Sequence, residues 1–157
     1  MTLHMPRQPR LALRTAHKTD VRAQFGALVW RVRKGKTQIL LITSRGRGRW
    51  IIPKGWPVDG ATPARAAAAE AWEEAGVRGR VHGHPLGLYF YAKRRPGLDD
   101  LPCLVMVYPV EAHRLETEFP EAGQRRRKWF SPKKAAARLD PPDLAAMARN
   151  FDPRALQ

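Results

Sequence analysis

Three glutamates are spaced so that one helix would carry them on a single face. Glu70, Glu73 and Glu74 stand at positions i, i+3 and i+4 of an alanine-rich run, and the helical repeat brings these positions together. Like charges at such spacings oppose helix formation by about 0.2–0.5 kcal/mol per pair. A divalent cation would remove that repulsion, and Mg²⁺ binds carboxylate oxygens together with substrate phosphates. The spacing therefore indicates a metal-dependent site that acts on phosphates.

The segment around these glutamates resembles the Nudix box, G-x5-E-x7-R-E-U-x-E-E-x-G-U, in which U is apolar. The matching positions are Gly55, Glu70, Glu73, Glu74, Gly76 and Val77. Two positions differ, because Ala61 replaces the first glutamate of the box and Ala69 replaces its arginine. Residues 49–55 also resemble the W-x-x-P-K-G lead-in of diadenosine polyphosphate hydrolases, and residues 126–130 resemble the late strand of diphosphoinositol polyphosphate phosphohydrolases.

The resemblance implies an α/β fold, the Nudix fold, with a mixed β-sheet sandwiched between α-helices. It also implies hydrolysis of a phosphoanhydride with Mg²⁺, or with Mn²⁺ in its place. The metal ligands are then Glu70, Glu73 and Glu74, one of which doubles as the general base. The carbonyl of Gly55 completes the coordination, and a further carboxylate comes from Glu118 or Glu121 in the loop before the late strand. Ala69 removes the side chain that would orient the ligand carboxylates.

Four basic residues just before the box are candidates for binding substrate phosphates. Lys54 directly precedes Gly55, and its flexible ammonium suits a phosphate oxygen. Arg45, Arg47 and Arg49 alternate with glycines in a loop, and we expect them to bind further phosphates. The alternative for all four is an exposed charge that keeps the surface soluble.

The charge of the chain favours a substrate with many phosphates. Its 29 Lys and Arg against 14 Asp and Glu give a net charge of +15, which attracts polyanions. We therefore expect a diadenosine polyphosphate or a diphosphoinositol polyphosphate rather than a sugar nucleotide. Two alternatives stay open. One is binding or 5′-end processing of RNA through the basic residues 1–20 and 125–128, and the other is a catalytically weak nucleotide-binding domain, suggested by Ala61 and Ala69.

Length and composition predict one domain. With 157 residues, 43% of them apolar, the chain can bury a core of its own. We expect a basic N-terminal arm over residues 1–20 and the hydrolase domain over residues 21–152. No apolar stretch approaches the ~20 residues of a membrane span, and the single Cys103 forms no internal disulfide, which fits a reducing compartment. We expect a cytoplasmic protein without a membrane partner, and the sequence predicts no oligomeric state.

The elements that must position these residues follow from apolar runs and turn residues. Thr62 is placed to cap a helix over residues 63–75 that ends at Gly76. Residues 101–111 form the most apolar run and are predicted to lie at the centre of the sheet. Residues 50–52 are predicted to form a strand that stops at Pro53. The remaining predicted elements are strands at 21–32, 37–43, 77–81, 86–92 and 125–130, and helices at 132–139 and 141–150.

Overall fold

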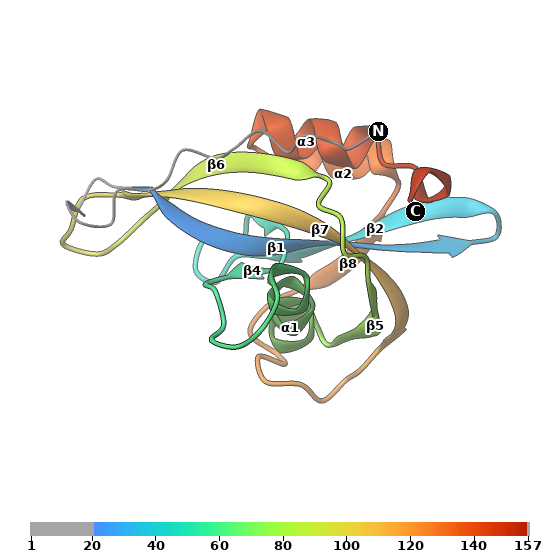
Figure 1. Ribbon diagram of the computed structural model, residues 1–157, viewed down its shortest axis with the longest axis horizontal. Coiled ribbons are helices and arrows are strands. Elements are labelled where there is room, and N and C mark those ends of the chain that lie inside the picture. Colours follow the sequence, from blue (N-terminus) through green and yellow to red (C-terminus); the bar gives the residue numbers. More distant parts are fainter. Residues whose placement is uncertain (1–20, 157) are drawn as a thin grey trace.

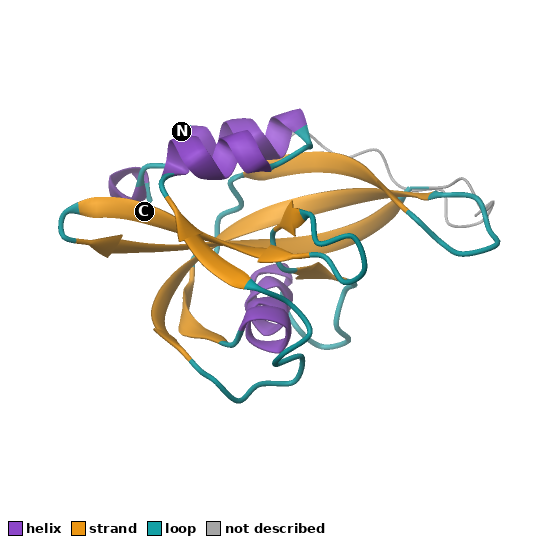
Figure 2. Cartoon of the chain, turned by 180° about the vertical axis from the view of Figure 1, so that it is seen from behind, coloured by secondary structure: helices purple, strands orange, loops and turns teal. Residues whose placement is uncertain are grey.

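The computed structural model describes residues 21–156 and shows a mixed sheet between two layers of helix. Helix α1 (Pro63–Ala75) packs on one face, while α2 (Pro132–Arg138) and α3 (Pro142–Arg149) cover the other, as Figures 1 and 2 show. The predicted fold class, a mixed β-sheet sandwiched between α-helices, is confirmed. The predicted arm over residues 1–20 lies outside the described residues.

Within the described residues, eight strands form one sheet. They are β1 (Arg22–Arg33), β2 (Lys36–Thr43), β3 (Trp50–Ile51), β4 (Lys54–Gly55), β5 (Val77–Val81), β6 (Gly87–Lys93), β7 (Leu101–Leu115) and β8 (Arg127–Phe130). A short 3-10 helix, η2 (Pro153–Ala155), follows α3. The bounds of α1 are those expected from its capping residues.

β1 and β7 form the centre of the sheet. Residues 22–30 pair in parallel with residues 103–111, while β6 and β5 pair antiparallel with the first and second halves of β7. The predicted central position of the 101–111 strand is confirmed, although the strand continues to Leu115 because β5 still pairs with it there. Pro109 is tolerated because it lies where the pairing passes from β6 to β5, so its missing N–H removes no ladder bond.

The segment from Trp50 to Gly55 lies between two strands that diverge. β1 and β2 pair only near their shared hairpin; farther along, β3 pairs with β2 and β4 pairs with β1. The prediction that strand structure stops at Pro53 was incomplete, because β4 forms directly after it. Pro53 does not interrupt the arrangement, since it contributes its carbonyl to the N–H of Ala27 at 2.9 Å. This geometry delivers Gly55 to the side of α1.

Alternating side chains of the sheet build two cores. On one face, Ala27 and Val29 of β1 pack with Ala67, Ala71 and Ala75 of α1, whose small side chains let the helix lie close to the sheet. On the other face, a second cluster buries residues of β1, β2 and β8 against α2 and α3, as the two-residue repeat of a strand requires. Among the described helices, none is both long and apolar enough to cross a membrane.

Candidate metal and phosphate site

β4 passes directly beside α1 at Gly55. A Cβ atom at this position would fall on the carboxylate of Glu70, so a larger residue would displace that side chain. The lack of a side chain at residue 55 therefore lets α1 present Glu70 against the main chain of β4. The structure thus brings together two of the residues that the sequence predicts as metal ligands.

Glu74 is the most enclosed of the three glutamates on α1, being 8% exposed. The main-chain N–H of Lys54 donates to its Oε2 at 3.3 Å, and the Arg125 guanidinium donates to its Oε1 at 3.5 Å. Glu70 is half-buried and Glu73 is exposed. Glu74 is therefore the fixed, buried carboxylate of the three, and Glu73 is the most exposed one.

The loop before β8 is tied to the C-terminal end of α1. The N–H of Glu121 donates to the carbonyl of Glu73 at 3.0 Å, and the Arg127 guanidinium donates to the carbonyl of Ala75 at 2.8 Å. These bonds satisfy carbonyls that the last turn of a helix leaves without partners. The bond from the Glu121 N–H itself holds Glu121 beside the helix glutamates, as its predicted role as a further ligand requires, whereas Glu118 is exposed on the same loop.

Arg125 joins the two acidic elements. Its guanidinium lies 3.5 Å from the carboxylate of Glu74 and 3.3 Å from that of Glu121, and it donates to the carbonyl of Thr43 at 3.2 Å. The side chain is 8% exposed, so it faces inward rather than toward solvent. The sequence places Arg125 only in the basic run 125–128, since no local pattern signals a contact between residues so far apart.

Burial and neighbouring carboxylates raise the pKa values of Glu70 and Glu74. For Glu70, burial together with neighbouring carboxylates, led by that of Glu74, raises the pKa to about 7. Burial also raises the pKa of Glu74, while the charges of Arg125 and Lys54 oppose that rise. Negative charge around Glu70 is thus incompletely balanced by the protein's own cations, and a bound divalent cation would relieve it.

The oxygen donors fit Mg²⁺ or Mn²⁺, although they do not converge on one point in advance. Among residues 21–156, no three or more His, Cys, Asp or Glu side chains form a cluster that could by itself hold a metal ion. Mg²⁺ needs no such cage, because it keeps several waters and takes one or two carboxylates together with phosphate oxygens. The close approach of Gly55 to Glu70 and the raised pKa of Glu70 are the features that favour a cation here.

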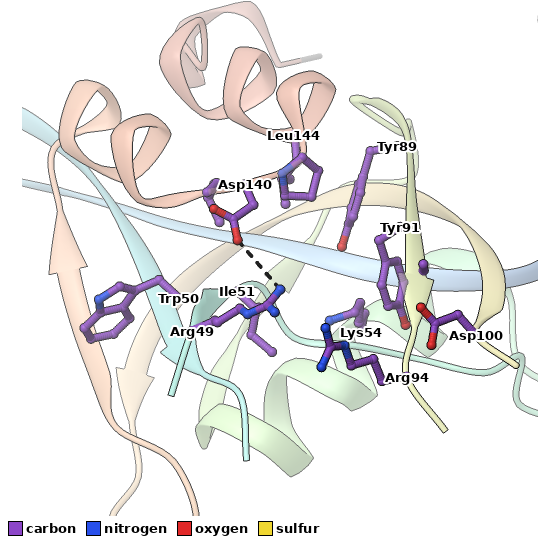
Figure 3. A pocket seen from close by; sticks show the side chains of 13 residues that line it. Arg49, Trp50, Ile51, Lys54, Tyr89, Tyr91, Arg94, Asp100, Asp140 and Leu144 are labelled. Carbon is purple, nitrogen blue, oxygen red and sulfur yellow. Dashed lines mark ion pairs between the residues drawn. The ribbon is translucent and has the colours of Figure 1, made fainter. Parts of the chain in front are cut away.

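A cavity of about 330 Å³ opens on the α3 side of β4. Figure 3 shows the side chains of Arg49, Lys54 and Arg94 around it, with a dashed line from Arg49 to Asp140, which lies 3.9 Å away. The remaining lining residues are Trp50, Ile51, Tyr89, Tyr91, Ala92, Asp100, Leu139, Pro141 and Leu144. Three cations against two acidic residues give the cavity a net positive lining, which suits phosphate groups.

Lys54 belongs to both regions. Its main-chain N–H contacts Glu74, while its ammonium lies 4.8 Å from the centre of the Tyr91 ring in the cavity. Burial lowers the pKa of Lys54 to about 8, and the charge of Glu74 acts in the opposite sense. The Tyr91 hydroxyl is fixed by donating to the Gln24 amide oxygen at 2.5 Å. The ring thus forms a rigid wall against which the ammonium rests.

The three arginines of the glycine-rich loop do not gather at one point. Arg49 lines the cavity, whereas Arg45 donates to Gln124 at 3.2 Å and lies 3.8 Å from Glu121. Arg47 is exposed and makes no hydrogen bond or ion pair with the part of the chain that the structure describes. The structure therefore places one of the three beside the cavity and one beside the acidic loop, while the third faces solvent.

The fold and the site define a class of protein: an α/β domain that sets a glutamate-bearing helix against a glycine at the end of a short strand. A model of the NUDIX domain matches residues 22–151 of this chain. The chain therefore belongs to the NUDIX domain family.

Individual relatives agree with that family. The chain is 32% identical over 107 residues to Nudix hydrolase 13, mitochondrial, of Arabidopsis thaliana, covering 65% of this chain and 53% of that protein. It thus spans about half the length of that relative. It is 28% identical over 117 residues to human diphosphoinositol polyphosphate phosphohydrolase 3-beta, covering 74% and 68% of the two chains. The solved C. elegans Ap4A hydrolase shares the fold, with a TM-score of 0.59 at 20% identity over 82% of this chain and 94% of that one.

Proposed function

We propose that this chain is a Nudix pyrophosphohydrolase that uses Mg²⁺ to cleave a phosphoanhydride bond of a highly anionic small molecule. The observation that carries the proposal is the double contact of Lys54, whose N–H meets Glu74 and whose ammonium lines the basic cavity. The acidic helix face and the cavity therefore adjoin at one residue. A substrate with its outer phosphates in the cavity would bring a phosphoanhydride to α1.

The helix glutamates would hold the metal. Glu70, Glu73, Glu74 and the carbonyl of Gly55 would bind it, with Glu121 as a further ligand, and bound Mg²⁺ supplies charge neutralisation at the phosphates and a lowered pKa for the attacking water. One of the three helix glutamates would also accept the proton of that water as a general base.

The cations of the cavity would bind the phosphates that are not cleaved. Arg49 and Arg94 present guanidinium groups, which match phosphate geometry with two parallel hydrogen bonds, while Lys54 acts as a point charge. This lining supports a substrate with many phosphates, such as a diphosphoinositol polyphosphate or a diadenosine polyphosphate. The names of the human relative and of the C. elegans structure support the same two substrate classes.

A substrate panel tests the proposal. Purified protein would be incubated with nucleoside triphosphates, diadenosine polyphosphates, diphosphoinositol polyphosphates and 5′-triphosphorylated RNA, each with Mg²⁺, with Mn²⁺ or with EDTA. We expect metal-dependent release of phosphate or nucleotide, and the highest kcat/KM for a small polyphosphate. No turnover of any anhydride by folded protein would overturn the proposal, and a clear preference for the RNA would replace its substrate class.

A further inference from the structure

The arginine that the Nudix box would place on α1 is missing, yet a guanidinium is present at the carboxylates. Ala69 offers no charge to its neighbours. Arg125, which enters from the loop before β8, instead lies within 3.5 Å of Glu74 and 3.3 Å of Glu121. The charge that the helix lacks is therefore supplied by another part of the chain.

The position of Arg125 is fixed from several sides. It donates to the carbonyl of Thr43 at 3.2 Å, and the N–H of the next residue, Arg126, donates to the Thr43 hydroxyl at 2.9 Å. On the other side, the N–H of Glu121 is bonded to the carbonyl of Glu73. The guanidinium thus bridges the end of β2, the acidic loop and α1, and the Arg125 side chain is largely buried among them.

We infer that Arg125 is a positioning residue that orients Glu74 and Glu121 toward a divalent cation and takes the place of the missing box arginine. The inference rests on the proposed function, since it assigns a metal to these carboxylates. A planar guanidinium can hold two carboxylates and a carbonyl at once, which an ammonium on a flexible stem does less well. Residues that hold a ligand commonly change metal affinity by about 10–100-fold when they are replaced.

A role in charge balance alone makes the opposite prediction. A guanidinium beside the carboxylates repels a metal cation, so its removal would leave metal affinity unchanged or raised if the geometry of Glu74 did not depend on it. A role in positioning requires metal affinity to fall. Binding of Mn²⁺ therefore separates the two roles before any substrate is added.

The experiment measures Mn²⁺ binding by calorimetry for the parent protein, Arg125→Met, Arg125→Lys and Arg127→Met. Arg127 is a matched control, because it is another part-buried arginine on the same segment that binds main-chain carbonyls of Ala75 and Glu116 instead of carboxylates. We expect Arg125→Met to weaken Mn²⁺ binding about tenfold or more. We expect Arg127→Met to lower the melting temperature while its Mn²⁺ affinity stays within about twofold of the parent.

The lysine variant keeps the test open if Arg125→Met does not fold. Arg125→Lys retains a compensating charge, so we expect a folded protein whose Mn²⁺ affinity is still reduced severalfold. Unchanged or tighter Mn²⁺ binding by either Arg125 variant would overturn the positioning role, and so would an equal loss of affinity in Arg127→Met.

Mn²⁺ binding also distinguishes failure of the proposed function from failure of the role assigned to Arg125. If the parent and Glu74→Gln bound Mn²⁺ equally, the metal site itself would be misassigned and the inference would fall with it. If the parent bound Mn²⁺ through Glu74 while Arg125→Met bound it equally well, only the inference about Arg125 would fail.

Discussion

The acidic face of α1 and the basic cavity adjoin at Lys54, but they are built in different ways. The carboxylates of Glu70 and Glu74 are held by main-chain contacts from Gly55 and Lys54 and by the buried Arg125. The cavity's cations are long side chains on loops and strand ends; Arg49, for example, has a side chain that is 50% exposed. One region has its geometry set by packing, and the other retains rotamer freedom.

This difference suggests that the two regions have different roles in the reaction. Groups that stabilise charge developing in the transition state must be held in place before the reaction, because moving them into position would cost the free energy that they contribute. Groups that only bind distant phosphates can adapt to the ligand, and they contribute equally to the ground state and the transition state. Substitutions on α1 should therefore affect kcat, and substitutions in the cavity should affect KM.

The largest expected effect is at Glu74. Glu74→Gln keeps the shape of the side chain but removes an anionic oxygen, and we expect kcat to fall by about a thousandfold, equivalent to about 4 kcal/mol of transition-state stabilisation. Steady-state kinetics with circular dichroism as the folding control would measure it. A folded Glu74→Gln protein with kcat within about tenfold of the parent would remove Glu74 from the site.

Substitutions in the cavity are expected to have a smaller effect, and on KM rather than kcat. Arg49→Gln with Arg94→Gln should raise KM about tenfold for a five-phosphate substrate, since two exposed charge contacts contribute about 1 kcal/mol each at most and 1.4 kcal/mol is tenfold. For a two-phosphate substrate the change should be smaller, and kcat should stay nearly constant for both. The control is Arg33→Gln with Lys36→Gln at the exposed hairpin end, which removes the same charge. Equal KM changes in the two double variants would show a general effect of net charge.

A modest effect of pH on the stability of the metal-free protein should come from Glu70 on the acidic face of α1, and it can be measured without substrate. The pKa of Glu70 is raised from 4.5 to about 7, so the folded protein binds more protons than the unfolded chain between these values. Stability of the metal-free protein should therefore decrease as pH rises from about 4.5 to 7. Glu70 is half-exposed, so solvent screening reduces the effect of this shift to about 1 kcal/mol, and we expect a fall in melting temperature of about 2–4 °C in a domain of this size. Glu70→Gln should flatten the profile in EDTA, and an equally steep profile in that variant would assign it to other groups.

The smallest effect on kcat is expected at Ala61 and Ala69, where the chain lacks the charged residues of the Nudix box. Ala69→Arg alone should change kcat by less than about threefold, because Arg125 already contacts the carboxylates. Ala61→Glu combined with Ala69→Arg should be non-additive, with a coupling of about 0.5 kcal/mol or more if the new side chains meet. A double-mutant cycle on kcat/KM and melting temperature would measure it, and strict additivity in both would show that the two positions act independently.

Sequence patterns predicted most of the elements and their order. Thr62, Pro63 and Gly76 located both ends of α1, because capping and backbone conformation are local properties. The apolar run over residues 21–32 likewise located β1 to within one residue at each end. The strand at Lys54–Gly55 was missed, since its pairing depends on how far β1 and β2 diverge and not on its own residues.

The sequence by itself determined the acidic helix face, because residues three and four apart in a helix are neighbours whatever surrounds them. It also determined that the chain is strongly basic. Only the tertiary structure decided which cations meet which carboxylates. Arg125 reaches Glu74 and Arg49 reaches the cavity because strand pairing and hydrogen bonds to the end of α1 bring distant segments together. The physical reason is that a contact between segments so far apart depends on the whole sheet, whereas a helix face depends on one turn.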